Sequence, residues 1–199
     1  MRRLLLGSLG GVLLAQSLLV VSALAQTLEG DPEAGRSKAG MCRTCHGLEG
    51  LARIPIAPHI GGESVTYLVH QLAAFRDGTR THEMMSVVAK SLDDQTIADL
   101  AAWYSAQRVT ARPPPGPAGE AAPQACVSCH GADGLAVIED APNLAGENTI
   151  YIATQLKAFR SGKRQHPVMS EIAAGLTDAE IRTVADWYAG TEIEIEPVR

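Results

Sequence analysis

Large aromatic side chains are scarce in this chain, in which Phe, Trp and Tyr together make up only 4% of 199 residues. There are two Phe and two Trp, although the total hydrophobic content is an ordinary 46%. This length allows one domain or two small ones. Domains of under about 100 residues are marginally stable without a metal, a disulfide or a cofactor. If the chain forms two small domains, each therefore needs something besides its own side chains to complete a core.

Strand patterns are also missing, since no stretch shows a convincing alternation of apolar and polar residues. Apolar residues recur instead at helical spacing, and Asp31-Pro32 has the N-cap and first-turn proline of a helix start. The other segments with this spacing are Glu63 to Arg76, Asp93 to Ala106, Glu147 to Arg160 and Asp178 to Ala189. We therefore predict an all-α fold.

Cysteine occurs only four times, and all four lie in two copies of Cys-x-x-Cys-His. The copies are Cys42-Arg43-Thr44-Cys45-His46 and Cys126-Val127-Ser128-Cys129-His130. Two thiols at this spacing can each add to one vinyl group of a haem, and the adjacent His can ligate the iron. The motifs predict two covalently bound haem c groups, which would also supply the missing core volume.

Other uses of the cysteines explain the motif less well. Two disulfides or a dithiol redox pair are possible in an oxidising compartment. A zinc ribbon separates its Cys pairs by roughly 15–20 residues, whereas Cys42 and Cys126 stand much farther apart. None of these alternatives explains why a His directly follows both pairs.

An internal repeat relates the two motifs. When the chain is shifted onto itself so that Cys42 meets Cys126, the alignment runs without a gap. Matching stretches include Tyr67/Tyr151, Gln71/Gln155, Phe75-Arg76/Phe159-Arg160, Arg80/Arg164, His82/His166, Met85/Met169 and Trp103-Tyr104/Trp187-Tyr188. The repeat predicts two tandem domains of one kind.

The domain boundaries follow from composition. Residues 109–122 contain a Pro/Gly-rich run and are predicted to be a linker between domains at 26–108 and 123–199. Residues 1–25 resemble a secretory signal peptide, with Arg2-Arg3, an apolar stretch and Ala23-Leu24-Ala25 at the cleavage site. A retained membrane anchor is the alternative. Cleavage would remove two positive charges from a chain whose formal net charge is −5.

The second axial ligand decides between an electron carrier and a catalyst, because an open iron position permits oxygen or peroxide chemistry. Met85 and Met169 correspond under the repeat and are the predicted ligands, whereas Met84 aligns with Val168. His82 and His166 also correspond and would give bis-His ligation.

Several other residues are candidates for support of the haems. Backbone carbonyls at or near Pro58 and Pro142 are expected to accept a hydrogen bond from the ligating His rings. Four arginines recur in Phe-Arg-x-Gly-x-Arg and could neutralise haem propionates, bridge the two halves or remain solvated, namely Arg76, Arg80, Arg160 and Arg164. His59 and His70 have no His counterpart and are expected to be surface or local hydrogen-bonding residues.

Together these residues resemble the dihaem cytochromes c of the cytochrome c4 type. The resemblance rests on both Cys-x-x-Cys-His motifs, on the segments 58–63 and 142–147, on Tyr-x-x-x-Gln-Leu-x-x-Phe-Arg-x-Gly-x-Arg and on Met-x-x-x-Ala-x-x-Leu. It implies two class I cytochrome c domains related by a pseudo-twofold axis, a periplasmic location and the axial pairs His46 with Met85 and His130 with Met169.

The resemblance and the absence of another catalytic constellation favour a diffusible electron carrier rather than an enzyme. Its expected partners are redox proteins such as a terminal oxidase, a reductase or a dehydrogenase, with no nucleic acid. The alternative is a haem subunit of a periplasmic dehydrogenase such as flavocytochrome c sulfide dehydrogenase, with membrane association only through the partner complex. A dihaem peroxidase or thiosulfate-oxidising enzyme would need an open or unusual ligand, which two matched Met oppose.

Overall fold

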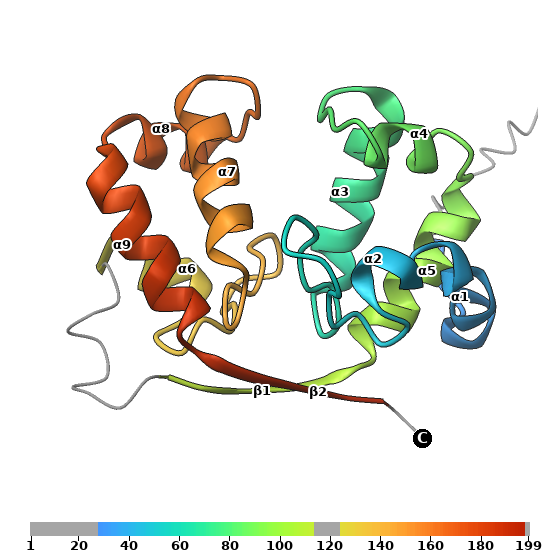
Figure 1. The fold of residues 1–199 in the computed structure, drawn as a ribbon. Coiled ribbons are helices and arrows are strands. Elements are labelled where there is room, and N and C mark those ends of the chain that lie inside the picture. Colours follow the sequence, from blue (N-terminus) through green and yellow to red (C-terminus); the bar gives the residue numbers. More distant parts are fainter. Residues whose placement is uncertain (1–27, 114–123, 198–199) are drawn as a thin grey trace, which may run out of the picture.

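The computed structural model describes residues 28–113 and 124–197, and these form two similar helical halves that lie side by side (Figure 1). The predicted signal peptide and most of the predicted linker lie outside the described residues. Within the described residues, no helix is long and apolar enough to cross a bilayer.

Residues 28–113 of the first half contain five α-helices and a short 3-10 helix, which begin and end at several of the residues predicted from the sequence. The elements are α1 (Pro32–Lys38), η1 (Ala39–Met41), α2 (Arg43–His46), α3 (Val65–Asp77), α4 (Met85–Ala89) and α5 (Asp94–Ser105). The Asp31 carboxylate caps α1, and Pro32 occupies the first turn. Gly78 ends α3 in the left-handed region at φ 79°.

The second half repeats this plan with α6 (Gln124–His130), α7 (Thr149–Arg160), α8 (Pro167–Ala174) and α9 (Asp178–Ala189). Thr177 and Glu180 form a capping box at the start of α9. Each half packs α3 or α7 against α5 or α9 around its own apolar cluster, and the largest fully buried side chains include Leu100 and Tyr188. Each half therefore has a small core of its own.

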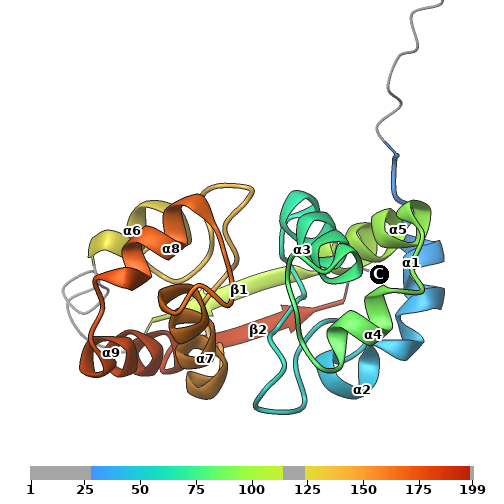
Figure 2. The ribbon, with the colours of Figure 1, turned by 90° about the horizontal axis from the view of Figure 1, so that it is seen from above.

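The prediction of no strands is wrong, because a two-stranded antiparallel ribbon links the halves. Strand β1 (Arg108–Arg112) follows the first half and pairs with β2 (Glu192–Glu196), which follows the second. The two strands occupy equivalent positions of the repeat, and Thr110 lies opposite Glu194 at the centre of the register. The ribbon runs beneath both halves (Figures 1 and 2).

The strands were missed for physical reasons. β2 does alternate, as Glu-Ile-Glu-Ile-Glu, but five residues at the end of a chain form a strand only when a partner is present. The partner strand β1 overlaps the start of the predicted linker, and its sequence alternates only weakly between apolar and polar residues.

Glycines allow the ribbon to lie directly on the halves. A Cβ atom at Gly62 would lie 2.1 Å from the Val109 side chain, and one at Gly146 would lie 2.4 Å from the Ile193 side chain. Gly61 similarly meets Ile195, so β2 leaves the second half and contacts the first. The ribbon therefore fixes how the two halves sit against each other.

Candidate functional site

The cysteines of both motifs lie on short helical turns beside an apolar cluster. Cys42 is the N-cap position of α2, which also carries Cys45, whereas Cys126 and Cys129 lie within α6. All four have intermediate exposure. Cys42 and Cys126 pack against the first and second core clusters, and burial raises the pKa of both thiols.

The histidine of each motif is buried and held by a proline carbonyl. His46 Nδ1 lies 2.9 Å from the Pro58 carbonyl oxygen, and His130 Nδ1 lies 2.8 Å from that of Pro142. Because a carbonyl oxygen can only accept, Nδ1 carries the proton in both rings and Nε2 keeps its lone pair. The predicted proline carbonyl contacts are confirmed, and burial lowers the pKa of both histidines.

Each of the two repeat-matched methionines packs on the apolar cluster of its own half. Met85 begins α4 and packs on the cluster that Cys42 contacts, and Met169 in α8 packs on the cluster that Cys126 contacts. Met84 is 61% exposed, so it does not share the packing of Met85.

His166 is the N-cap of α8, and His82 makes similar hydrogen bonds just before α4. His82 Nδ1 accepts from the backbone N–H of Met84 and Met85. His166 Nδ1 accepts in the same way from the N–H of Met169, at 3.2 Å. Each ring therefore orients the backbone that carries the methionine.

The four recurring arginines divide into two pairs. Arg76 and Arg160 stay within their own halves, where they bind the carboxylates of Asp94 and Asp178. Arg80 and Arg164 bridge the halves instead.

The bridging pair is reciprocal. Arg80 donates to Gln71 of its own half at 2.6 Å and to Gln155 of the other half at 3.0 Å. Arg164 donates to Gln155 at 2.8 Å and to Gln71 at 2.9 Å. Each guanidinium also lies over a phenylalanine ring and reaches the tyrosine hydroxyl of the opposite half, Tyr151 for Arg80 and Tyr67 for Arg164.

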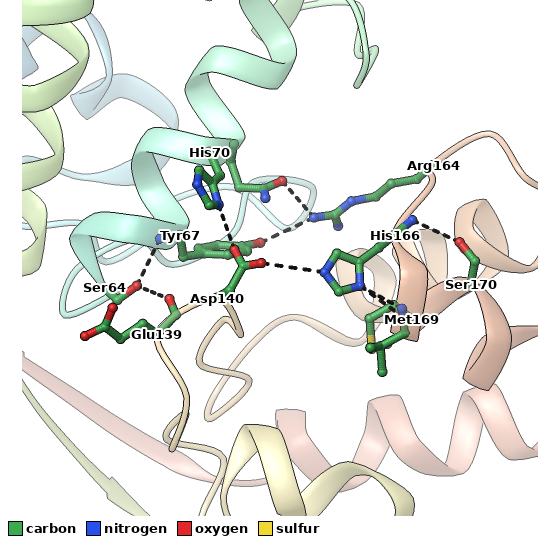
Figure 3. Close-up of polar contacts among 11 residues, drawn as sticks. Ser64, Tyr67, His70, Glu139, Asp140, Arg164, His166, Met169 and Ser170 are labelled. Carbon is green, nitrogen blue, oxygen red and sulfur yellow. Dashed lines mark hydrogen bonds and ion pairs between the residues drawn. The ribbon is translucent and has the colours of Figure 1, made fainter. Parts of the chain in front are cut away.

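A second set of contacts across the halves is centred on Asp140. Its carboxylate lies 2.9 Å from His70 Nδ1 of α3 and 3.7 Å from His166 Nε2 (Figure 3). Beside it, the Ser64 hydroxyl, which caps α3, donates to the Glu139 carbonyl oxygen. His70 is exposed, as predicted for a surface residue, but its carboxylate partner belongs to the other half.

The expectation for His59 is only half right. Its Nδ1 accepts locally from the Ala52 N–H at 2.9 Å, but its Nε2 lies 3.1 Å from the Gly146 carbonyl oxygen across the interface. Asn143 does the same with an amide, since its Oδ1 accepts from Ala136 and its Nδ2 donates to the Gly62 carbonyl. The imidazole therefore reproduces the two contacts of the asparagine.

Two buried glutamates were not singled out from the sequence. Glu63 and Glu147 are each 3% exposed and are repeat equivalents that end the motifs 58–63 and 142–147. Burial raises the pKa of Glu63 well above its usual value and that of Glu147 to about 8. The sequence does contain a signal for them, because a glutamate follows glycine at the same position of both repeats, which is unusual for a simple surface turn.

The residues present fit two haem groups. Each half brings one motif cysteine and one methionine to the same apolar cluster, and the imidazole of the motif keeps its Nε2 lone pair because its Nδ1–H faces a proline carbonyl. Arg80 and Arg164 have only uncharged hydrogen-bond partners among the described residues, which suits them to carboxylates such as propionates. Within residues 28–113 and 124–197, no group of three or more His, Cys, Asp or Glu is arranged to hold a metal ion directly.

Known proteins resemble the chain over most of its length. The family profile described as cytochrome C oxidase, cbb3-type, subunit III, matches residues 118–187. Cytochrome c4 from Pseudomonas aeruginosa is 33% identical over 81% of this chain and 89% of its own. A thiosulfate dehydrogenase electron acceptor from Thiomonas intermedia is 34% identical over 76% of this chain and 79% of its own.

A solved structure shows the same architecture. Reduced recombinant cytochrome c4 from Pseudomonas stutzeri superposes with a TM-score of 0.72 at 28% identity, covering 82% of this chain and all of that one. The similarity confirms the predicted all-α fold of two tandem cytochrome c domains and the prediction of two covalently bound haem c groups. From its sequence, its fold and these relatives, the chain belongs to the cytochrome c4 family of dihaem electron-transfer proteins.

Proposed function

We propose that this protein is a periplasmic electron carrier in which His46 and Met85 ligate one haem iron and His130 and Met169 ligate the other. The proposal rests on an arrangement that occurs in both halves. Each half has a buried imidazole whose Nδ1 is held by a proline carbonyl. Each half also has a methionine that packs on the same apolar cluster as a motif cysteine. Cys42, Cys45, Cys126 and Cys129 are the proposed sites of covalent attachment.

The side chains would keep both irons closed. A haem with His and Met ligands accepts or donates one electron and leaves no position for a substrate. The proline carbonyls orient the imidazoles, and the rings of His82 and His166 orient the methionine backbones. Electrons would therefore leave by outer-sphere transfer to a protein partner such as a terminal oxidase or reductase.

The acidic charge of the chain suits a transient encounter with a basic docking surface on the partner. The proposed domains are residues 26–108 and 123–199, joined by 109–122, and residues 1–25 would direct export. Mass spectrometry of the protein from a periplasmic fraction tests this, with an N-terminus near Gln26 as the expected result. An intact N-terminus in the membrane fraction would support the anchor instead.

Optical spectroscopy tests the ligands. Methionine ligation gives an absorption band at about 695 nm in the oxidised protein. Met85→Ala and Met169→Ala are each expected to remove about half of this band, and Met84→Ala is the matched control that keeps it. If the band survives intact in Met85→Ala and Met169→Ala, the assignment is wrong.

A second function is favoured by the similarity to thiosulfate dehydrogenase electron acceptors. In that case a dehydrogenase, rather than a general donor, would deliver the electrons to this chain, either during encounters or within a stable complex. Reduction of the purified protein by thiosulfate dehydrogenase and thiosulfate tests this route. Gel filtration of a native extract separates a free carrier from a subunit, because the subunit elutes with its catalytic partner.

A further inference from the structure

One peptide group in each half is hydrogen-bonded at both ends. In the first half, the carbonyl of Pro58 accepts from His46 Nδ1, and the N–H of the same amide, which belongs to His59, donates to Glu147 Oε1 at 2.5 Å. The imidazole, the amide and the carboxyl therefore form a continuous chain of hydrogen bonds.

The second half has the same chain. The Pro142 carbonyl accepts from His130 Nδ1, and the Asn143 N–H of that amide donates to Glu63 at 3.1 Å from Oε1 and 3.0 Å from Oε2. The arrangement occurs twice at equivalent positions, so it belongs to the repeat and not to one loop.

Both chains cross the interface. Glu147 precedes α7 of the second half but binds the amide of the first, and Glu63 precedes α3 of the first half but binds the amide of the second. Both carboxyls are buried, so water does not screen them from these amides.

Hydrogen bonds in such a chain polarise one another. An amide that donates to a carboxyl becomes a stronger acceptor at its carbonyl oxygen. A stronger acceptor at Nδ1–H raises the basicity of the imidazole, and a more basic axial ligand stabilises the oxidised iron.

We propose that Glu147 and Glu63 are positioning residues that set the reduction potential of the haem in the opposite half, through the peptide that holds its axial histidine. This inference rests on the proposed ligation of the irons by His46 and His130. It gives each domain a direct influence on the redox centre of its neighbour.

The test replaces one carboxyl at a time in the holoprotein. Glu147→Gln keeps the shape and an acceptor oxygen but replaces the ionisable carboxyl by a neutral amide, and Glu63→Gln is the matched variant for the other half. Potentials are measured at pH 9, with each haem assigned by NMR. The titratable groups facing these carboxyls are His59, Tyr67 and the two carboxyls themselves. Both His59 and Tyr67 are neutral at that pH, since burial lowers the pKa of His59 and raises that of Tyr67 to about 12.

We expect Glu147→Gln to raise the reduction potential of the first haem and leave that of the second unchanged. Glu63→Gln should raise the potential of the second haem and leave that of the first unchanged. The amide proton of His59 in the reduced protein should shift in Glu147→Gln, and that of Asn143 in Glu63→Gln. These amide shifts report on the hydrogen bonds independently of electron transfer.

Equal shifts in both haems, shifts confined to the haem of the mutated half, or unchanged potentials with shifted amides would overturn the proposal. Glu147→Asp and Glu63→Asp withdraw the carboxyl from the amide while keeping an ionisable group, and they should give the same half-specific pattern if either Gln variant folds poorly. The band at about 695 nm checks the ligands separately. Its loss refutes the proposed ligation, whereas its presence with unmoved potentials refutes only the influence of the glutamates.

Discussion

His59 Nε2 lies 3.1 Å from the carbonyl oxygen of Gly146 in the other half. In the second repeat, the side-chain amide of Asn143 makes the equivalent contact to the carbonyl of Gly62. His59→Asn should therefore keep both hydrogen bonds and unfold within about 0.5 kcal/mol of the wild type. His59→Ala leaves the Ala52 N–H and the Gly146 carbonyl without their partner and should cost about 1–3 kcal/mol. Chemical denaturation of the holoprotein measures both, and equal losses in the two variants would contradict this equivalence.

The same substitution should change the response to acid. Burial lowers the pKa of His59 below its usual 6.5. Below pH 6.5 the unfolded chain binds a proton that the folded chain resists, so stability falls as the pH drops. His59→Asn should lose less stability than the wild type between pH 7 and pH 5, as followed by denaturation midpoints. An identical loss would show that His59 is not buried as a neutral ring.

Glu147 should act in the opposite direction on the pH axis. Burial raises the pKa of its carboxyl from 4.5 to about 8. Between these values the unfolded chain has released a proton that the folded chain keeps, so the free energy of unfolding decreases as the pH rises. Glu147→Gln should flatten this decrease, by on the order of a few kcal/mol at pH 9. Replacement of the exposed Glu83 by Gln is the control and should leave the curve unchanged.

Arg80 and Arg164 should be energetically coupled because both donate to Gln71 and Gln155. In a double-mutant cycle of Arg80→Ala and Arg164→Ala, we expect a coupling energy of about 0.5–3 kcal/mol in the free energy of unfolding. The matched control is the pair Arg76→Ala and Arg160→Ala, whose partners lie within their own halves. That pair should be additive, and coupling of equal size in both cycles would refute the bridge.

Gly62 should be among the least replaceable glycines. It has φ +74°, and a Cβ atom there would lie 2.1 Å from the side chain of Val109 in β1. Gly78 has a similar φ of +79°, but nothing lies within 4 Å of its Cβ position. Gly78→Ala should cost about 1–2 kcal/mol from backbone strain alone, and Gly62→Ala should cost distinctly more because β1 must also move. Thermal denaturation compares them, and equal melting temperatures would mean that the ribbon does not press on the first half.

The helices and the cofactor were predictable because their signals are local. Asp31, Gly78 and the repeated Cys-x-x-Cys-His specify caps and attachment chemistry within a few residues of sequence. The proline carbonyls also follow from local chemistry, since a ligating imidazole needs an acceptor at Nδ1.

The contacts between the halves were not predictable in the same way. The role of Glu63 and Glu147 depends on the backbone amide that each binds. That amide lies in the other domain, so the sequence near each glutamate does not reveal it. The strands of the ribbon depend equally on a partner far along the chain. The repeat reveals which residues are equivalent, but equivalence alone does not say that their contacts are exchanged.

The register of the ribbon has a consequence for how the two halves recognise each other. Because equivalent strands pair about a common centre, the chain is in effect an isologous dimer fused into one polypeptide. Its charges have diverged, so that Arg108 and Arg112 face Glu196 and Glu192. If two copies of the first half paired in this way, arginine would face arginine across the ribbon. If two copies of the second half paired, glutamate would face glutamate. The charges on the ribbon therefore favour pairing of the first half with the second over pairing of either half with a copy of itself.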